Sequence, residues 1–310
     1  MIVTVTLNPS LDRTVHFPGV AWGAVNRASR SALDLSGKGV NVSIALRQLG
    51  HESVIVGLAA GAFGRVLVEG LQAQGYRCEF VETAGETRSN VTVIEDGTGR
   101  SMKLNEAGPP APPEALAALE ARLAGLLSPG DIVALAGSLP PGAPVDTYAR
   151  LVDVAHGCGA LVALDSSGPA LAAGCRAAPD LIKPNEHEAA ELVGHPLETD
   201  LSETLNALRA LGPGRVLLSL GATGAAYADG TGCWRATPPP ITEVNNVGAG
   251  DAALAGAIAA WSEGAPPEEI LRLAVATGTA TACLDGTAFP PRAAVKDVYC
   301  RVTVTREGGE

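Results

Sequence analysis

A run of small residues around one carboxylate, at 245–256, is the segment of this chain best suited to chemistry. Gly248, Ala249 and Gly250 precede Asp251, and small apolar residues follow it. At the start of a helix the first backbone N–H groups have no intrahelical acceptor and the helix dipole adds positive potential, so this turn can hold a phosphate. Asp251 beside that phosphate makes sense as a general base facing a second substrate. A phosphate-binding turn beside a general base is the minimum that phosphoryl transfer to a hydroxyl requires.

A plainer interpretation of the same run is a helix cap, because Gly-rich turns with Asp at a helix start are common. Three familiar motifs are excluded. Ala253 stands where the third glycine of a dinucleotide fingerprint would be, and the chain contains no G-x-x-x-x-G-K-[ST] loop. Ser138 does not lie in a G-x-S-x-G elbow, so we reject a hydrolase nucleophile there.

A second group of residues is suited to binding a sugar. Gly37 and Gly39 let the backbone approach a ligand closely. Lys38 between them supplies a positive charge, and Asn41 can donate and accept hydrogen bonds toward hydroxyls. Asp12 follows the first predicted strand, where a parallel sheet carries its ligand crevice. The alternatives are a glycine turn with a solvated lysine and, for Asp12, a simple turn.

A third group is suited to phosphates and a metal ion. Arg88 begins a polar, alternating stretch and suits a bidentate phosphate contact. Asn185 and Glu188 lie one helical turn apart, just after Lys183, and could hold a magnesium–phosphate unit through water. The alternative is an ordinary helix N-terminus with an acidic first turn. The Gly-rich turn at 219–224 follows a strand and is another candidate phosphate or ribose contact.

Elements that would position these residues follow from the apolar pattern. Short runs rich in Val, Ile and Leu, apolar on both faces, alternate with Ala- and Leu-rich helical stretches. This alternation predicts an α/β fold in which helices cover both sides of a parallel sheet. The clearest predicted strands are 2–7, 53–58, 131–136, 160–165 and 215–220. The predicted helices lie near 39–49, 63–74, 113–127, 145–157, 186–193, 201–211, 249–263 and 267–284.

Two stretches, 13–35 and 88–104, depart from that rhythm. Both alternate apolar and polar residues around a turn, which predicts half-exposed antiparallel strands. A small sheet built from both insertions could cover a site on the main sheet. The alternative is a pair of surface hairpins without function.

Composition limits the class of protein. The 310 residues are 46% hydrophobic, enough for one large core or a core domain with an appendage. A net charge of -11 argues against a nucleic-acid or membrane partner. The six cysteines form no C-x-x-C pair or zinc spacing, and no apolar run approaches the roughly 18–20 residues that span a bilayer. We therefore expect a cytoplasmic protein with reduced thiols.

Taken together and in this order, these motifs resemble the PfkB family of sugar kinases, in the ribokinase superfamily, over essentially the whole chain. Lysine between two glycines is most similar to the 1-phosphofructokinase and tagatose-6-phosphate kinase branches. The motifs that carry the resemblance are N-P-S-L-D at 8–12, G-K-G-V-N at 37–41, T-R-S-N at 87–90, A-G-S-L-P-P-G at 136–142, D-S-S at 165–167, K-P-N-E-H-E at 183–188, S-L-G-A-T-G at 219–224 and V-G-A-G-D at 247–251.

The resemblance implies a role for each matching residue. Asp251 would be the catalytic base, and the backbone of Gly248, Ala249 and Gly250 the anion hole for the transferring phosphoryl group. The residues that would bind the sugar are Asp12, Gly37, Gly39 and Asn41, and those that would meet its existing phosphate are Lys38 and Arg88, helped by Ser138. The residues that would contact ATP are Lys183, Asn185, Ser219, Gly221, Thr223 and Gly224, with Glu188 supporting magnesium through water.

The same resemblance implies a three-layer α/β/α ribokinase-like kinase domain over 1–310, with a mostly parallel central sheet and a small β lid at roughly 13–35 and 88–104. It implies a homodimer that forms through the lid. The implied reaction is ATP-dependent phosphorylation of D-fructose 1-phosphate to fructose 1,6-bisphosphate. Tagatose-6-phosphate kinase and 6-phosphofructokinase are the nearest rivals. A non-catalytic sugar-phosphate sensor is another, although it would have no need of Asp251.

One departure from the family pattern leaves a question open. Asn245 and Asn246 replace the Ser-Thr pair often seen before V-G-A-G-D. A nucleotide or monovalent-cation contact at this point is therefore an open alternative.

Overall fold

A ten-stranded sheet organises the computed structural model, which describes residues 1–197, 200–284, 286 and 288–307. The first seven strands along the sheet from β5 to β11 pair in parallel, and the last three are antiparallel. The order is β14-β13-β12-β11-β10-β9-β8-β1-β4-β5. The bounds are β1 (Ile2–Thr6), β4 (Ser53–Ala60), β5 (Arg77–Thr83), β8 (Ile132–Ala136), β9 (Leu161–Asp165), β10 (Leu181–Ile182), β11 (Arg215–Ser219), β12 (Ala225–Asp229), β13 (Gly232–Thr237) and β14 (Thr303–Glu307). All five predicted strands are present.

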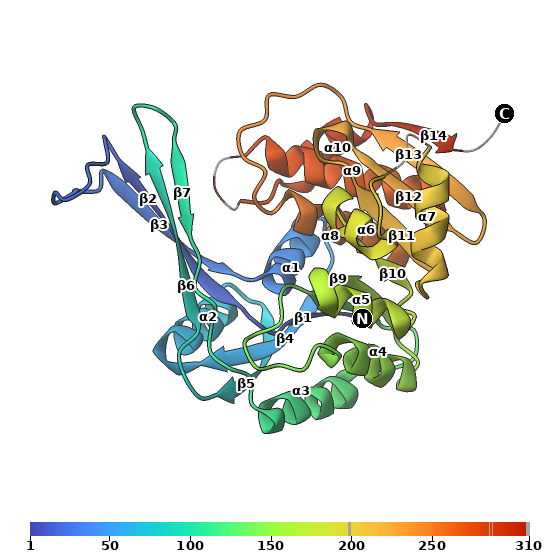
Figure 1. Ribbon diagram of the computed structural model, residues 1–310, viewed down its shortest axis with the longest axis horizontal. Helices are drawn as coiled ribbons and strands as arrows, with labels where there is room; N and C mark the ends of the chain where they lie inside the picture. Colours follow the sequence, from blue (N-terminus) through green and yellow to red (C-terminus); the bar gives the residue numbers. More distant parts are fainter. Residues whose placement is uncertain (198–199, 285, 287, 308–310) are drawn as a thin grey trace.

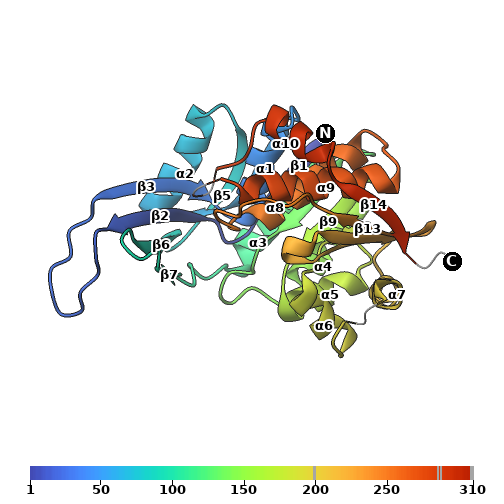
Figure 2. The same ribbon diagram turned by 90° about the horizontal axis from the view of Figure 1, so that it is seen from above.

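Helices cover both faces of this sheet and complete the predicted three layers (Figure 1, Figure 2). Along β8, Val133 and Leu135 pack into the core on one face, whereas Ile132 and Ala134 pack into the core on the other. Because β8 is buried on both faces, its residues are apolar throughout and show no alternation. One layer contains α1 (Lys38–Gln48), α2 (Gly61–Ala73), α8 (Ala249–Ser262), α9 (Pro267–Ala282) and α10 (Arg292–Tyr299). The other contains α3 (Pro113–Leu126), α4 (Thr147–Gly157), α5 (Gly168–Arg176), α6 (Glu186–Val193) and α7 (Leu201–Ala210).

The two insertions build a separate four-stranded sheet that projects from the main body (Figure 1). Its order is β3-β2-β6-β7, with bounds β2 (Ser10–Phe17), β3 (Arg30–Ser36), β6 (Arg88–Glu95) and β7 (Ser101–Leu104). Each insertion is an antiparallel hairpin as expected, and the two hairpins join through β2 and β6, which pair in parallel. β2 begins at Ser10, so Asp12 lies in a strand and not in a turn.

Gly39 lies where α1 passes close to β1, and its lack of a side chain permits that approach. A Cβ at this position would lie 2.6 Å from the Val5 carbonyl oxygen, which belongs to the backbone and cannot rotate away. We expect Gly39→Ala to lower the free energy of unfolding by about 1–3 kcal/mol, because overpacking must displace a chain segment. Urea unfolding measures this. Gly125→Ala in α3, where an added Cβ meets nothing within 4 Å, is the control and should be neutral or stabilising. Equal unfolding midpoints for the two variants would contradict the packing account.

Candidate active site

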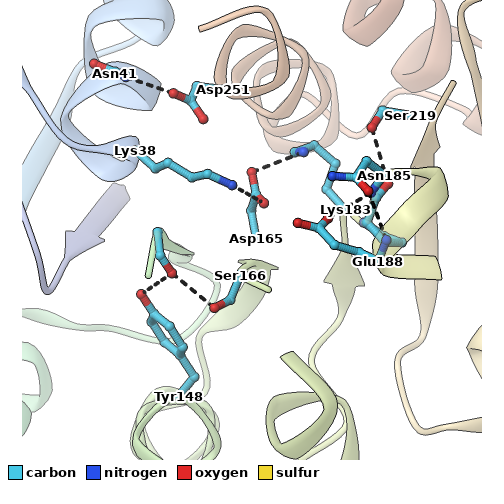
Figure 3. A network of polar contacts seen from close by, with 12 residues as sticks. Lys38, Asn41, Tyr148, Asp165, Ser166, Lys183, Asn185, Glu188, Ser219 and Asp251 are labelled. Carbon is cyan, nitrogen blue, oxygen red and sulfur yellow. Dashed lines mark hydrogen bonds and ion pairs between the residues drawn. The ribbon is translucent and has the colours of Figure 1, made fainter. Parts of the chain in front are cut away.

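The charged residues of the site meet at one edge of the large sheet, where strands end and helices begin (Figure 3). β9 and β10 pair in parallel with Leu164 beside Ile182. The next residues are therefore neighbours too: Asp165 ends β9, and Lys183 directly follows β10. Lys38 is the first residue of α1. In open parallel sheets this edge is the usual place for a ligand crevice. The sequence motifs are therefore brought together where the fold class places a site.

The N-terminus of α8 has the geometry expected of an anion-binding turn. Gly248 is its N-cap in the left-handed conformation, with φ 78°, and Asp251 lies in the first turn. The helix-cap interpretation of Asp251 is wrong, because the cap position belongs to Gly248 and no side chain caps it. The Ala249 amide donates to the Asn246 carbonyl at 3.2 Å, so a phosphate would compete with that carbonyl for one of the three expected N–H groups.

Asp251 is a buried carboxylate, only 7% exposed. Its Oδ2 accepts a hydrogen bond of 2.8 Å from Nδ2 of Asn41, which joins α1 to α8. Burial raises the pKa of Asp251 to about 6, and the positive charge of Lys38 opposes that shift. A base with a pKa just below neutral is ionised at working pH and still accepts a proton readily. Asn41, expected to bind sugar hydroxyls, thus also orients the candidate base.

A second buried carboxylate, Asp165, pairs with two lysines. Its Oδ1 lies 2.9 Å from Nζ of Lys38 and its Oδ2 lies 3.1 Å from Nζ of Lys183. Burial favours the neutral form of Asp165, but Lys183 and Lys38 together outweigh it and lower its pKa. The neighbouring Asp165 in turn raises the pKa of Lys38 although burial opposes the rise. Sequence reasoning placed Asp165 only at the end of a strand. A lone carboxylate closing an apolar strand was the signal available.

Lys183 points toward the anion-binding turn. Its Nζ lies 3.5 Å from the position that a Cβ on Gly250 would occupy. The side chain is buried and carries its charge to the N-terminus of α8. Lys183 is therefore placed to contact a phosphate held by that turn.

Asn185 and Glu188 form a capping box at the start of α6. Asn185 Oδ1 accepts from the Glu188 amide and Glu188 Oε2 accepts from the Asn185 amide, both at 2.9 Å. The ordinary helix N-terminus is thus present, and it fixes the Glu188 carboxylate near the lysines (Figure 3). A magnesium contact through water stays a prediction. Among the residues that the structure describes, no three His, Cys, Asp or Glu side chains gather to hold a metal. Magnesium here would take most of its ligands from phosphates and water.

The 219–224 turn follows β11 next to the capping box. Ser219 donates from its hydroxyl to the Pro184 carbonyl at 3.3 Å. Gly221 and Thr223 bound a 3₁₀ turn, in which the Thr223 hydroxyl donates to the Leu220 carbonyl. Gly224 has φ 106°, and a Cβ there would overlap the Ala236 carbonyl oxygen. Local packing thus accounts for Gly224, and nucleotide contacts of the turn stay predictions.

The candidate sugar-binding residues lie where β2 and β6 meet the main sheet. Asp12 Oδ1 accepts from Nδ2 of Asn90 at 2.8 Å, across the pairing of these two strands. Arg88 donates to the backbone carbonyls of Asn8 and Glu106. Asn8 Nδ2 donates to Ser138 Oγ at 3.5 Å, which links Arg88 to Ser138 through one residue.

Gly37 directly precedes Lys38, and its backbone conformation and close packing both call for glycine. Its φ is 126°, and a Cβ would lie 2.8 Å from the Thr6 hydroxyl. Lys38 and Arg88 bind different partners here, Asp165 and backbone carbonyls respectively. Their convergence on the phosphate of a sugar stays a prediction.

The loop before α8 is held by the segment after α9. Asn245 Nδ2 donates to the Gly286 carbonyl at 2.7 Å, and Asn245 Oδ1 accepts from the Val247 amide at 3.0 Å. Asn245 therefore stabilises this loop. Binding of a cation at the loop remains an open alternative. Among the helices that the structure describes, none is long and apolar enough to cross a bilayer.

Comparison with known proteins shows the family of this chain. Residues 6–294 match the model of the pfkB family carbohydrate kinases, and the chain belongs to this family. It is 38% identical over 306 residues to a 1-phosphofructokinase of Rhodobacter capsulatus, covering 98% of this chain and 97% of that one. A 1-phosphofructokinase of Bacillus subtilis is 36% identical over 285 residues, covering 91% and 92%. Phosphofructokinase-2 of Escherichia coli, solved in complex with potassium, superposes with a TM-score of 0.93 at 30% identity, covering 97% and 98%.

Burial of the base predicts a measurable cost to stability. The folded pKa of Asp251, about 6, lies above its ordinary 3.8, so the native state binds a proton more tightly than the unfolded chain. Stability from this group is complete below about pH 4 and is lost as the pH rises through 6. We expect Asp251→Asn to be more stable than wild type by about 3 kcal/mol at pH 8 and equal to it near pH 4.

Urea unfolding at several pH values measures this difference. Asp297→Asn, which removes an exposed carboxylate from α10, is the control and should show no such pH dependence. An Asp251→Asn variant that is less stable than wild type at pH 8 would refute the account of Asp251 as a desolvated base.

Proposed function

We propose that this carbohydrate kinase transfers the γ-phosphoryl group of ATP to the 6-hydroxyl of D-fructose 1-phosphate, giving fructose 1,6-bisphosphate and ADP. The observation that carries the proposal is the buried Asp251 carboxylate at the N-terminus of α8, with the ammonium groups of Lys38 and Lys183 close by. The curated relatives named 1-phosphofructokinase, 36–38% identical over most of the chain, support the choice of acceptor.

The reaction follows from the charges of the site. Asp251 takes the proton of the 6-hydroxyl as that oxygen attacks the γ-phosphorus, and the bond from this phosphorus to the bridging oxygen of ADP breaks in line. The α8 turn and Lys183 stabilise charge on the transferring group, because their dipoles and charge are fixed before the reaction. Magnesium bound with ATP would neutralise phosphate charge, and Glu188 is the residue that would support it.

Specificity in this proposal rests on the phosphate that the sugar already carries. Arg88, assisted by Ser138, would meet this phosphate, and Lys38 would add positive charge from the side of Asp251, while Asp12 and Asn41 hold the hydroxyls. An enzyme with a net charge of -11 must offset repulsion of a dianionic substrate locally, which these cations do. Binding energy from the remote phosphate also helps position the reacting hydroxyl.

Acceptor screening with ATP tests the proposal. We expect fructose 1-phosphate to give the highest kcat/KM, with unphosphorylated fructose a poor acceptor. Asp251→Asn should lose about 10²–10⁴-fold in kcat and keep substrate binding, whereas the surface variant Asp297→Asn keeps full activity. Preference for tagatose 6-phosphate or fructose 6-phosphate would reassign the substrate. Binding without turnover in the wild type would favour a sugar-phosphate sensor.

We propose further that the small sheet acts as a lid and that its outer face is the interface of a homodimer. Strand register places Leu33, Arg13, Val91 and Leu104 in one row across the sheet. Leu33 and Leu104 are 52% and 51% exposed, and Met102 on the same face is 40% exposed. The opposite face carries polar residues such as Asp12, which belongs to the candidate sugar site. Such a two-faced sheet buries its apolar side most simply against a second copy.

Sedimentation velocity tests the dimer. We expect the wild type at micromolar concentration to sediment with twice the mass of one chain, and Leu104→Glu to sediment as a monomer, because it replaces an exposed apolar side chain of this face with a charge. Lys103→Glu, one residue away on the other face of β7, is the matched control and should stay dimeric. A wild-type monomer, or equal dissociation in both variants, would refute the assignment of this face.

A further inference from the structure

Asp165 is a site carboxylate to which the proposed reaction gives no task. It closes β9, whose other residues are apolar, and its side chain is 1% exposed. A buried charge at such a place is strongly unfavourable unless it is paired. A core of this kind would be more easily built with an apolar residue, so the charge calls for an explanation.

The two carboxylate oxygens are divided between two cations from different elements. Oδ1 pairs with Lys38, which starts α1, and Oδ2 pairs with Lys183, which follows β10 (Figure 3). Without Asp165, these two ammonium groups would be uncompensated like charges, one of them on the buried Lys183 side chain. Each would then move toward solvent or lose its proton more readily.

The lysines held in this way have distinct directions. Lys183 Nζ lies beside Gly250 at the anion-binding turn, and Lys38 lies between the two buried carboxylates, Asp165 and Asp251. We infer that Asp165 is a positioning residue, whose two oxygens hold Lys38 and Lys183 together so that both charges converge on the N-terminus of α8 and on the base. The catalytic role of Asp165 rests on the proposed phosphoryl transfer. The pairing of Asp165 with both lysines, called the bridge below, does not depend on that reaction.

The bridge also sets the field at Asp251. The charged and titratable groups of this cluster, besides Asp251, are Lys38 from α1, Lys183 after β10, Asp165 from β9, Tyr148 from α4 and Glu188 from α6. The Tyr148 hydroxyl donates to the Gly137 carbonyl at 2.9 Å, and burial raises its pKa, so it adds no charge. Removing the Asp165 charge leaves both lysines uncompensated, which favours ionisation of Asp251 and makes it a weaker base.

NMR of the lysine side chains tests the bridge without any substrate. The chain contains only four lysines, and Lys103 and Lys296 are exposed. With ¹³Cε-lysine, Asp165→Asn should shift the signals of Lys38 and Lys183 together and leave the other two in place. Asp131→Asn is the matched control, since it removes another buried ion pair, with the N-terminus, at the opposite edge of the sheet. It should shift neither site signal.

A lysine substitution tests whether one carboxylate truly serves both. Lys38→Met should move the Lys183 signal when Asp165 is present and leave it unmoved in the Asp165→Asn background. Lys183→Met assigns the remaining signal. Lys signals that respond independently of each other, or a Lys183 signal unaffected by Lys38→Met in the otherwise wild-type chain, would overturn the bridge.

Kinetics then separate positioning from mere stability. We expect Asp165→Asn to lose about 10²-fold in kcat and to move the acid limb of its kcat/KM profile to lower pH. Asp165→Glu keeps the charge but displaces the lysines, so it should lose kcat with an acid limb like that of wild type. A structural role alone would lower the melting temperature, as we expect for Asp131→Asn, and leave kcat and the limb unchanged, which would overturn the inference. If the wild type fails to phosphorylate fructose 1-phosphate, the proposed function falls while the NMR result still decides the bridge.

Discussion

Pairing of buried charge at the carboxyl edge of the sheet is the interaction on which the site depends. Two buried carboxylates, Asp165 and Asp251, lie in one cluster with the buried Lys183 and with Lys38, whose side chain is 40% exposed. Asp165 pairs with both lysines and has its pKa lowered, whereas Asp251 accepts from Asn41 and has its pKa raised by burial. One carboxylate therefore anchors cations and the other remains available to take a proton. Environment, not residue type, separates the two roles.

The fold supplies this cluster from parts that are distant in sequence. Asp165 and Lys183 lie side by side because β9 and β10 are parallel neighbours. Lys38 and Asp251 lie in the first turns of α1 and α8, which belong to one helical layer. Glycines at the contacts let helices and turns approach backbone that a Cβ would strike. The projecting sheet is connected to β1 by the short loop before β2, the strand that carries Asp12. Membership in the pfkB family is consistent with each of these features.

Much of this could be predicted from the sequence, because apolar periodicity reports burial directly. The five clear strands and eight helices were confirmed, and α6 matched its predicted bounds. Missed were α5, α10, β5 and the antiparallel strands β12–β14, each of which is a short run. The role of Asp165 was missed because it depends on register between β9 and β10, which no local pattern contains. Partners of Arg88 were also beyond reach, since they are backbone carbonyls supplied by loops.

The central claim is that Asp251 accepts the proton of the attacking hydroxyl while the α8 turn holds the transferring phosphoryl group. A crystal structure of the protein with fructose 1-phosphate and a non-hydrolysable ATP analogue tests it most directly. The account predicts the 6-hydroxyl oxygen within about 2.6–3.2 Å of the Asp251 carboxylate, with the terminal phosphate of the analogue at Gly250. A terminal phosphate bound there with the 6-hydroxyl out of reach of Asp251 would contradict it.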